Sequence, residues 1–401
     1  METAVQGNNH DDVRRHNLSI ILRAVHRGGP TSRAGLTRLT GLNRSTISAL
    51  VAELTQLGVV TERQPDATRQ VGRPSPVVEA NGRVAVLAVH PEIDAVTVGL
   101  VGLGGIVHRR IRCPVEQSPD AAEAVRLAAA VIDDLRAELD TEFDVVGVGV
   151  AVPGLVRTTD GVVRRAPHLG WVDEPFAEQL AAASGFAVVA ANDASLGVLA
   201  ERYFGVGQGL TDLIYLNGGA SGIGGGLLVG GQVVGGHSGY AGEFGHTRVS
   251  ESDVLDSAGF RGTLEAEVTR SALLDALGLT ATGLAATDAD ELERALLASD
   301  SPQVRAEVHR QLDYLAVALA GAVNVLNPQL VVLGGFLAAL RAADPERLDN
   351  AVAALTLPEA LAEVRIDSAR LGSDLLMIGA AELAFEGVLV NPQGFVRRPA
   401  A

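Results

Sequence analysis

The residues best suited to bind a ligand follow the ends of short apolar runs. Asn192 and Asp193 come directly after the run 187–191, and Glu243 and His246 follow a glycine-rich stretch. Folds that alternate strands and helices place their ligand sites at strand ends. Carboxylates and amides there can exchange hydrogen bonds with neighbouring hydroxyl groups. Two plainer interpretations stay open: Asp193 could cap a helix beginning at Ala194, and Glu243 with His246 could form a surface turn.

The N-terminal part, residues 1–83, has the pattern of a DNA-binding unit. Apolar residues at helical spacing predict a helix over 14–26, and a second helix is expected through residue 39. After a turn at Gly41, Asn43 can cap a third helix that runs to about residue 57. Two helices joined by a short glycine-containing turn form a helix-turn-helix.

The outer face of the third helix is polar and small, which suits the major groove of DNA. The residues expected to contact DNA there are Arg44, Ser45, Thr46 and Ser48. Two short β-prone runs at 59–60 and 77–78 predict a two-stranded wing, whose loop carries Arg69 and Arg73. The sequence at 72–74 resembles a minor-groove hook. The alternative is a small helical bundle that docks another protein.

The distribution of charge indicates a basic DNA-binding unit attached to an acidic body. The net charge is −16, yet residues 1–83 hold 11 Arg against 7 acidic residues, and the remainder holds 21 Arg against 41. The acidic body would repel DNA and leave contact to the N-terminal part. One cysteine excludes an intramolecular disulfide, and no apolar run reaches membrane-spanning length. These features predict a cytoplasmic protein.

The remainder of the chain, residues 84–401, has the pattern of a two-lobed α/β body with a cleft. Three consecutive strands are expected over 84–113, followed by a helix over 120–139 and a buried strand at 145–150. Alternating glycines in that strand indicate close backbone approach. Strands and helices then alternate, and the sequence becomes mostly helical after Glu251. A last helix is expected over 377–387.

The order and spacing of these motifs resemble the ROK family, and its NagC/XylR-like repressors in particular. The resemblance covers essentially the whole chain and implies a winged helix-turn-helix followed by a two-lobed, actin-like (ribonuclease-H-like) body that binds sugar between its lobes. It implies that the last helix packs back on the first lobe. It also implies that five residues face the sugar, with Asp193 in the place of the kinase general base: Asn192, Asp193, Glu243, His246 and Glu265. His168 takes a place where relatives carry a ligand-contacting Asn.

This sequence departs from the family at the ATP motif. Kinases of the family carry Asp-x-Gly-x-Thr, for which this chain has His90-Pro91-Glu92-Ile93-Asp94. Glu92 and Asp94 would repel a triphosphate, and Pro91 lacks a backbone donor. We therefore expect no ATP chemistry, and we interpret the glycine runs at 221–226 and 333–335 as tight turns.

A second departure concerns zinc. Relatives bind it with one His and three Cys, but the matching positions here are Asp256, Ala258 and Thr263. A tetrahedral site needs four ligands, so we expect no metal. His246 would be free for the sugar, and the loop would be ordered by packing.

The sequence thus predicts a sugar-responsive DNA-binding regulator, a repressor that a sugar or sugar derivative releases from its operator, with no catalytic residues and no cofactor. The expected units are 1–83, the DNA-binding domain; 84–190, the first lobe; and 191–401, the second. The expected partners are double-stranded operator DNA and the sugar, with no membrane, in a homodimer or a dimer of dimers. The alternatives are an ATP-dependent sugar kinase with a DNA-binding module, and a protein-docking regulator that ignores sugar.

Overall fold

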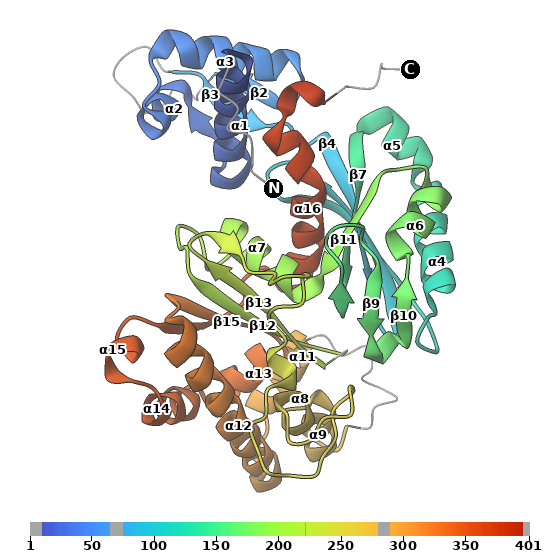
Figure 1. Cartoon of the computed structure of the whole chain (residues 1–401), viewed down its shortest axis with the longest axis vertical. Helices are drawn as coiled ribbons and strands as arrows, with labels where there is room; N and C mark the ends of the chain where they lie inside the picture. Colours follow the sequence, from blue (N-terminus) through green and yellow to red (C-terminus); the bar gives the residue numbers. More distant parts are fainter. Residues whose placement is uncertain (1–9, 65–74, 221, 280–288, 396–401) are drawn as a thin grey trace.

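The computed structural model describes residues 10–64, 75–220, 222–279 and 289–395. At one end of the molecule lie three helices and a small sheet (Figure 1). The helices are α1 (His10–Gly28), α2 (Arg33–Thr40) and α3 (Arg44–Gln56), and the sheet order is β1-β3-β2, from Thr31–Ser32, Val77–Ala80 and Val60–Arg63. The side chains of Ser32 and Asn43 accept from the backbone at the starts of α2 and α3, as helix caps do. Gly41 ends α2 in the left-handed conformation, which a turn between two helices requires.

The first large sheet of the body has the order β11-β7-β4-β5-β6. Its strands are β4 (Val84–Pro91), β5 (Ala95–Gly102), β6 (Ile106–Pro114), β7 (Asp144–Val152) and β11 (Val188–Asn192). One face packs against α4 (Ala121–Asp134) and α6 (Phe176–Ser184). Beside it lies a small sheet in the order β10-β9-β8, from Trp171–Glu174, Val163–Ala166 and Leu155–Val156.

The helix expected over 120–139 is wrong in one respect, because a turn at Leu135 divides it into α4 and α5 (Arg136–Glu142). Buried residues on both sides of the turn, Ile132 and Leu139, belong to one core, so the apolar spacing continues across it. The close approach indicated by the glycines of β7 is confirmed. A Cβ at Gly149 would collide with the carbonyl oxygen of Ala380, in the last helix.

The second large sheet has the order β14-β13-β12-β15-β16. Its strands are β12 (Leu213–Gly219), β13 (Gly222–Val229), β14 (Gln232–Val233), β15 (Leu330–Gly335) and β16 (Arg365–Ser368). Helix α7 (Asp193–Phe204) packs on one face. The other face carries a helical region: α8 (Leu264–Glu267), α9 (Arg270–Ala276), α11 (Ala289–Leu297), α12 (Pro302–Leu326), α13 (Phe336–Ala343) and α14 (Pro345–Leu355), with the short α15 (Pro358–Leu361) nearby.

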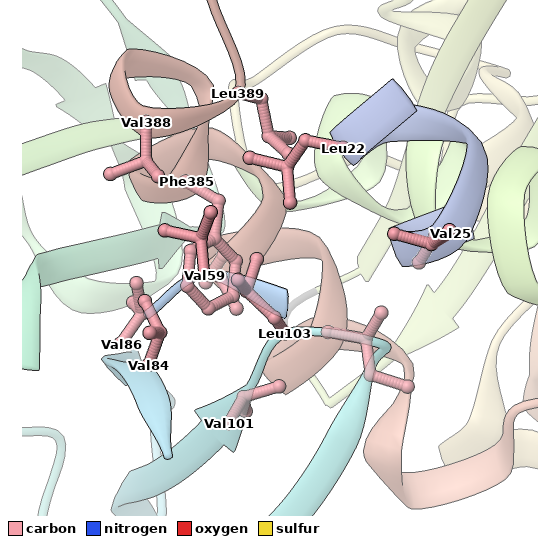
Figure 2. Packing of buried hydrophobic residues seen from close by; sticks show 14 of the residues in the cluster. Leu22, Val25, Val59, Val84, Val86, Val101, Leu103, Phe385, Val388 and Leu389 are labelled. Carbon is pink, nitrogen blue, oxygen red and sulfur yellow. The ribbon is translucent and has the colours of Figure 1, made fainter. Parts of the chain in front are cut away.

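The last helix, α16 (Leu375–Val390), joins the parts of the molecule. It packs on β4 and β7 of the first sheet, on α7, and on α1 of the N-terminal unit. Figure 2 shows Phe385 and Leu389 of α16 among side chains that include Leu22 of α1 and Val84 of β4. A single apolar cluster therefore connects the helix-turn-helix to the body. None of the helices in the described part of the chain has the length and apolar character needed to cross a bilayer.

Candidate sugar site and its surroundings

Asn192 and Asp193 lie where β11 ends and α7 begins. Asn192 is the helix cap: its Oδ1 accepts from the backbone N of Ser195 at 2.9 Å, and its amide donates to the carbonyl of Gly154 at 3.1 Å. Asp193 is the first helical residue, is 7% exposed, and accepts from the backbone N of Ala194 at 2.8 Å. The interpretation of Asp193 as the helix cap is therefore wrong, and Asn192 takes that role.

The carboxyl group of Asp193 titrates unusually high. Burial raises its pKa to about 6, with a further contribution from Glu92, while His90 and the Ala194 backbone act in the opposite direction. At neutral pH the group is still mostly a carboxylate, and it accepts hydrogen bonds only. An ionised carboxylate at a strand end can accept a hydrogen bond from a hydroxyl group of a ligand.

His168 and Glu265 come together across the cleft. His168 lies in a short 3₁₀ turn at 167–169, and its Nε2 is 3.3 Å from Oε1 of Glu265 at the start of α8. Glu265 also accepts from the backbone N of Ile223 at 3.1 Å and from the Ser257 hydroxyl at 2.5 Å. Gly222, with φ of +87°, makes room for this pair, because a Cβ there would collide with the Glu265 carboxylate. These hydrogen bonds keep the pKa of Glu265 below its usual value although burial would raise it.

Glu243 and His246 lie in and beside a second 3₁₀ turn, at 244–246. Burial raises the pKa of Glu243, and the charges of Asp193 and Glu265 add to the increase, while His246 lowers it. The structure thus brings Asp193, Glu243 and Glu265 within electrostatic reach of one another. All six predicted sugar-site residues belong to this neighbourhood, although they come from separate elements.

His246 is only partly free for the sugar, because one of its two ring nitrogens has a partner in the chain. Its Nδ1 is 2.8 Å from Oδ2 of Asp256, whose side chain is fully buried. The same oxygen accepts from the Thr263 hydroxyl at 2.9 Å, and Oδ1 accepts from the backbone N of Ala258 and Phe260 at 2.9 and 2.8 Å. We call His246, Asp256 and Thr263 the loop clasp. It orders the loop by hydrogen bonding, whereas the sequence predicted packing.

The loop clasp occupies the place where the family resemblance implies zinc. Both oxygens of Asp256 are already engaged by donors of the chain, and Ala258 contributes only its backbone. The residues present do not supply the four ligands of a tetrahedral zinc site. This donor set does not fit zinc.

The turn after β4, where the kinase ATP motif would lie, is charged but balanced. His90 donates to the carbonyl of Ala151 at 2.8 Å, and its Nε2 is 3.6 Å from Glu92. Arg112 is 2.7 Å from Asp94. Burial would lower the pKa of His90, but Glu92 and Asp193 raise it to about 9. The two carboxylates that the sequence predicts to repel a triphosphate are therefore paired with cations of the chain itself.

A cavity of about 650 Å³ opens beside this charged turn. His168 and Glu265 line it, whereas Asn192, Asp193, Glu243 and His246 do not. Its other walls include Asp94 of the β4–β5 turn, Arg270 of α9 and Phe336 of α13. Sequence reasoning missed Arg270 and the α9 wall, since an Arg at a helix start carries no signal of its own.

The residues expected to contact DNA lie at the start of α3. Arg44 and Ser45 are exposed, while Thr46 and Ser48 are half-buried. Ser45 donates to the Asn43 cap at 2.7 Å, and Ser48 lies 3.4 Å from Arg33, so both have partners within the unit. Arg69 and Arg73 lie outside the described residues. The strands of the predicted wing, β2 and β3, are confirmed as an antiparallel pair.

Comparisons with known proteins agree with this architecture. A model described as "ROK family" matches residues 96–386, and one described as "MarR family" matches residues 19–70. The chain is 24% identical to the xylose repressor of Caldicellulosiruptor bescii over 397 residues, which is 96% of this chain and 99% of that protein. It is 28% identical to the glucokinase of Halalkalibacterium halodurans over 67% of this chain and 84% of that one.

A solved structure of similar shape extends over nearly the whole molecule. It is a ROK family transcriptional regulator described as a homologue of the E. coli MLC protein, with a TM-score of 0.75 and 22% identity, covering 95% of this chain and 98% of that one. The predicted fold class is thereby confirmed: a helix-turn-helix unit precedes an actin-like, sugar-kinase-fold body. Both repressors and glucokinases are among the relatives.

Proposed function

This chain belongs to the ROK family, and we propose that it is a sugar-responsive DNA-binding repressor which a sugar or sugar derivative releases from its operator. One observation carries the proposal: α16 packs at once against the helix-turn-helix and against the lobe that borders the candidate sugar site. A change of lobe closure could therefore reach the DNA-binding unit through packed side chains.

The DNA-binding half of the proposal rests on α3. Its exposed N-terminal residues, Arg44 and Ser45, can reach bases and phosphates in the major groove. We further propose that Thr46 and Ser48 contribute contacts, and that Arg69 and Arg73 belong to the DNA-contacting wing. A single helix-turn-helix makes few contacts with bases and phosphates, so a homodimer or a dimer of dimers on a palindromic operator is the expected assembly. Operator binding would place the protein in the cytoplasm.

The sugar-binding half rests on the grouping of carboxylates and amides described above. We propose that Asn192, Asp193, Glu243, Glu265 and His168 exchange hydrogen bonds with the sugar hydroxyls. His246 would contribute through its Nε2, because the loop clasp occupies its Nδ1. The proposed units are residues 1–83 for DNA, and 84–190 and 191–401 for the two lobes of the body.

The alternative function is an ATP-dependent sugar kinase with an attached DNA-binding module, as the glucokinase relative allows. We propose that kinase activity is absent. A phosphate cradle needs backbone donors and small residues, whereas the turn after β4 carries the His90–Glu92 and Asp94–Arg112 pairs. Steady turnover of ATP in a coupled assay with a panel of sugars would contradict this proposal and support the kinase function.

The deciding experiment measures operator binding with and without sugar. DNA selected from a random pool by the full chain supplies the operator, and fluorescence anisotropy gives its Kd. We expect at least one sugar to weaken binding by about tenfold or more, which corresponds to about 1.4 kcal/mol of coupling. A body that ignores sugar would show neither this change nor a rise of melting temperature with any sugar. The protein would then be a docking regulator.

A further inference from the structure

The cavity of about 650 Å³ is continuous with the candidate sugar site, and its shape and charge bear on the effector. Glu265 and His168 line one side of the cavity, so a ring bound to them borders it. The space continues past α8 to Leu274 on α9 and Phe336 on α13. Leu274 lies one turn beyond Arg270, so the cavity follows α9 along its axis. Pockets of about 300–1,000 Å³ hold ligands larger than one sugar ring.

The charge of the lining argues against an anionic ligand. Three carboxylate residues line the cavity, Asp94, Glu265 and Asp275, against the one guanidinium of Arg270, and the enclosed carboxylate of Asp256 lies behind the same wall. Asp94 and Glu92 attract that guanidinium from the other lobe, so it is partly neutralised by the chain. Hydrogen bonds hold the pKa values of Asp256 and Glu265 below their usual values, despite burial, so both are ionised at neutral pH. A phosphate or triphosphate would meet a negative wall.

The remaining lining suits an uncharged saccharide. Polar groups of Ser257 and Thr269 lie on the same side of the cleft as Glu265, where they can meet hydroxyl groups. Val268, Leu274 and Phe336 are nearly fully buried and present an apolar surface to the cavity. A sugar ring has hydroxyl edges and C–H faces, and both kinds of surface find partners here.

We propose that this cavity receives the second and further rings of an uncharged saccharide whose first ring lies against Asp193, Glu243 and Glu265. The proposal rests on the proposed sugar-responsive function and narrows the effector to a neutral di- or oligosaccharide. Carbohydrate then occupies the space beside the charged turn after β4, and sugar phosphates and nucleotides do not bind there.

The test is isothermal titration of the full-length chain with neutral monosaccharides, their disaccharides, glucose 6-phosphate and a non-hydrolysable ATP analogue. The monosaccharides are glucose, xylose, galactose, mannose and N-acetylglucosamine. We expect one disaccharide to bind about tenfold or more tightly than its own monosaccharide, and neither phosphate compound to bind. Tighter binding of glucose 6-phosphate than of glucose would overturn the proposal.

A matched pair of variants at one exposed position locates the second ring. Ser271 lines the cavity on α9 and is exposed, so Ser271→Trp fills the space without disturbing the core. We expect Ser271→Trp to weaken the best disaccharide by about tenfold and its monosaccharide by less than about twofold, while Ser271→Ala leaves both near their original Kd. If the disaccharide and its monosaccharide bind equally well, and Ser271→Trp changes neither Kd, the second-ring site is refuted and the proposed repressor function is unaffected. If no saccharide binds, both the second-ring site and the proposed sugar response are wrong.

Discussion

His26 of α1 and Glu382 of α16 form a buried hydrogen-bonded pair between the helix-turn-helix and the body. They are 1% and 4% exposed. The backbone N of Gly104 donates to Nδ1 of His26 at 2.7 Å, which assigns the donating proton to Nε2, the atom facing Glu382. Arg27 donates to the other carboxylate oxygen at 3.1 Å. Two neighbouring residues of α1 thus meet one carboxylate of α16, and the β5–β6 turn holds the histidine from its other side, next to the apolar cluster of Figure 2.

The first prediction concerns this junction. Glu382→Ala should lower the free energy of unfolding by about 3–5 kcal/mol, because it leaves His26 and the Arg27 guanidinium without their buried partner. Glu382→Gln keeps an acceptor and should cost less, about 1–3 kcal/mol. In Glu382→Gln the sugar should change operator affinity less than in the wild type, since the packed link is weakened. Urea unfolding and operator anisotropy measure both effects.

The matched control for the junction lies one helical turn further along α16. Glu386 pairs with Arg23 at 2.7 Å, and its side chain is 53% exposed. Exposed pairs contribute about 0–1 kcal/mol, so Glu386→Gln should leave both stability and the sugar response almost unchanged. Equal effects of the two Gln variants would show that the buried junction has no special role.

The second prediction concerns DNA contact. Arg44→Ala should weaken operator binding by about 1–3 kcal/mol and leave the melting temperature unchanged, because Arg44 is exposed at the start of α3. Arg73→Ala should weaken binding in the same way through the wing. Arg305→Ala removes an exposed Arg from α12 in the body and serves as the control for charge. Operator affinity that falls equally in all three variants would point to a general charge effect.

The third prediction separates sugar response from folding. Asp193→Asn should abolish the response to sugar, since an ionised acceptor is lost, while operator affinity without sugar stays the same. Its melting temperature at pH 7 should not be lower than that of the wild type, because burial raises the pKa of Asp193 and so disfavours the charged form. Glu243→Ala should also abolish the response. Glu178→Gln on the exposed side of α6 is the control. A retained response in Asp193→Asn would remove this residue from the site.

The fourth prediction follows from the pKa of His90. Since that pKa rises from 6.5 to about 9 on folding, the folded chain holds a proton that the unfolded chain releases between these values. The resulting stability is fully present below pH 6.5 and is lost as the pH rises through about 9. In the His90→Asn variant this pH-dependent loss should disappear. Denaturant unfolding at a series of pH values from 6 to 10 measures it, and parallel curves for the two proteins would contradict the assignment.

Local signals in the sequence predicted the elements but not the long-range pairs. The helix caps at Ser32 and Asn43 and the apolar spacing of α1 are local, so the helix-turn-helix could be placed closely. The turn at Leu135 could not, because the apolar spacing continues through it. The charge balance at Asp94 could not be predicted, since its partner Arg112 stands on another strand. The His26–Glu382 pair joins residues 356 positions apart, and no local pattern predicts it.

The fifth prediction concerns the loop clasp. Asp256 holds His246, Thr263 and two backbone N–H groups with a fully buried side chain, and the neighbouring Ser257 donates to Glu265 of the sugar site. Asp256→Ala should therefore destabilise the chain by about 3–5 kcal/mol and weaken sugar binding. Asp253→Ala, on a side chain that is 92% exposed, should do neither.

Because the clasp is built from the chain's own donors, a metal chelator should leave melting temperature and sugar affinity of the wild type unchanged. A structural zinc contributes directly to folding, so its removal would lower the melting temperature markedly. Melting curves with and without chelator, combined with metal analysis of the purified chain, distinguish the two. Bound zinc lost together with stability would show that His246 serves a metal and that the hydrogen-bonded clasp is not what orders the loop.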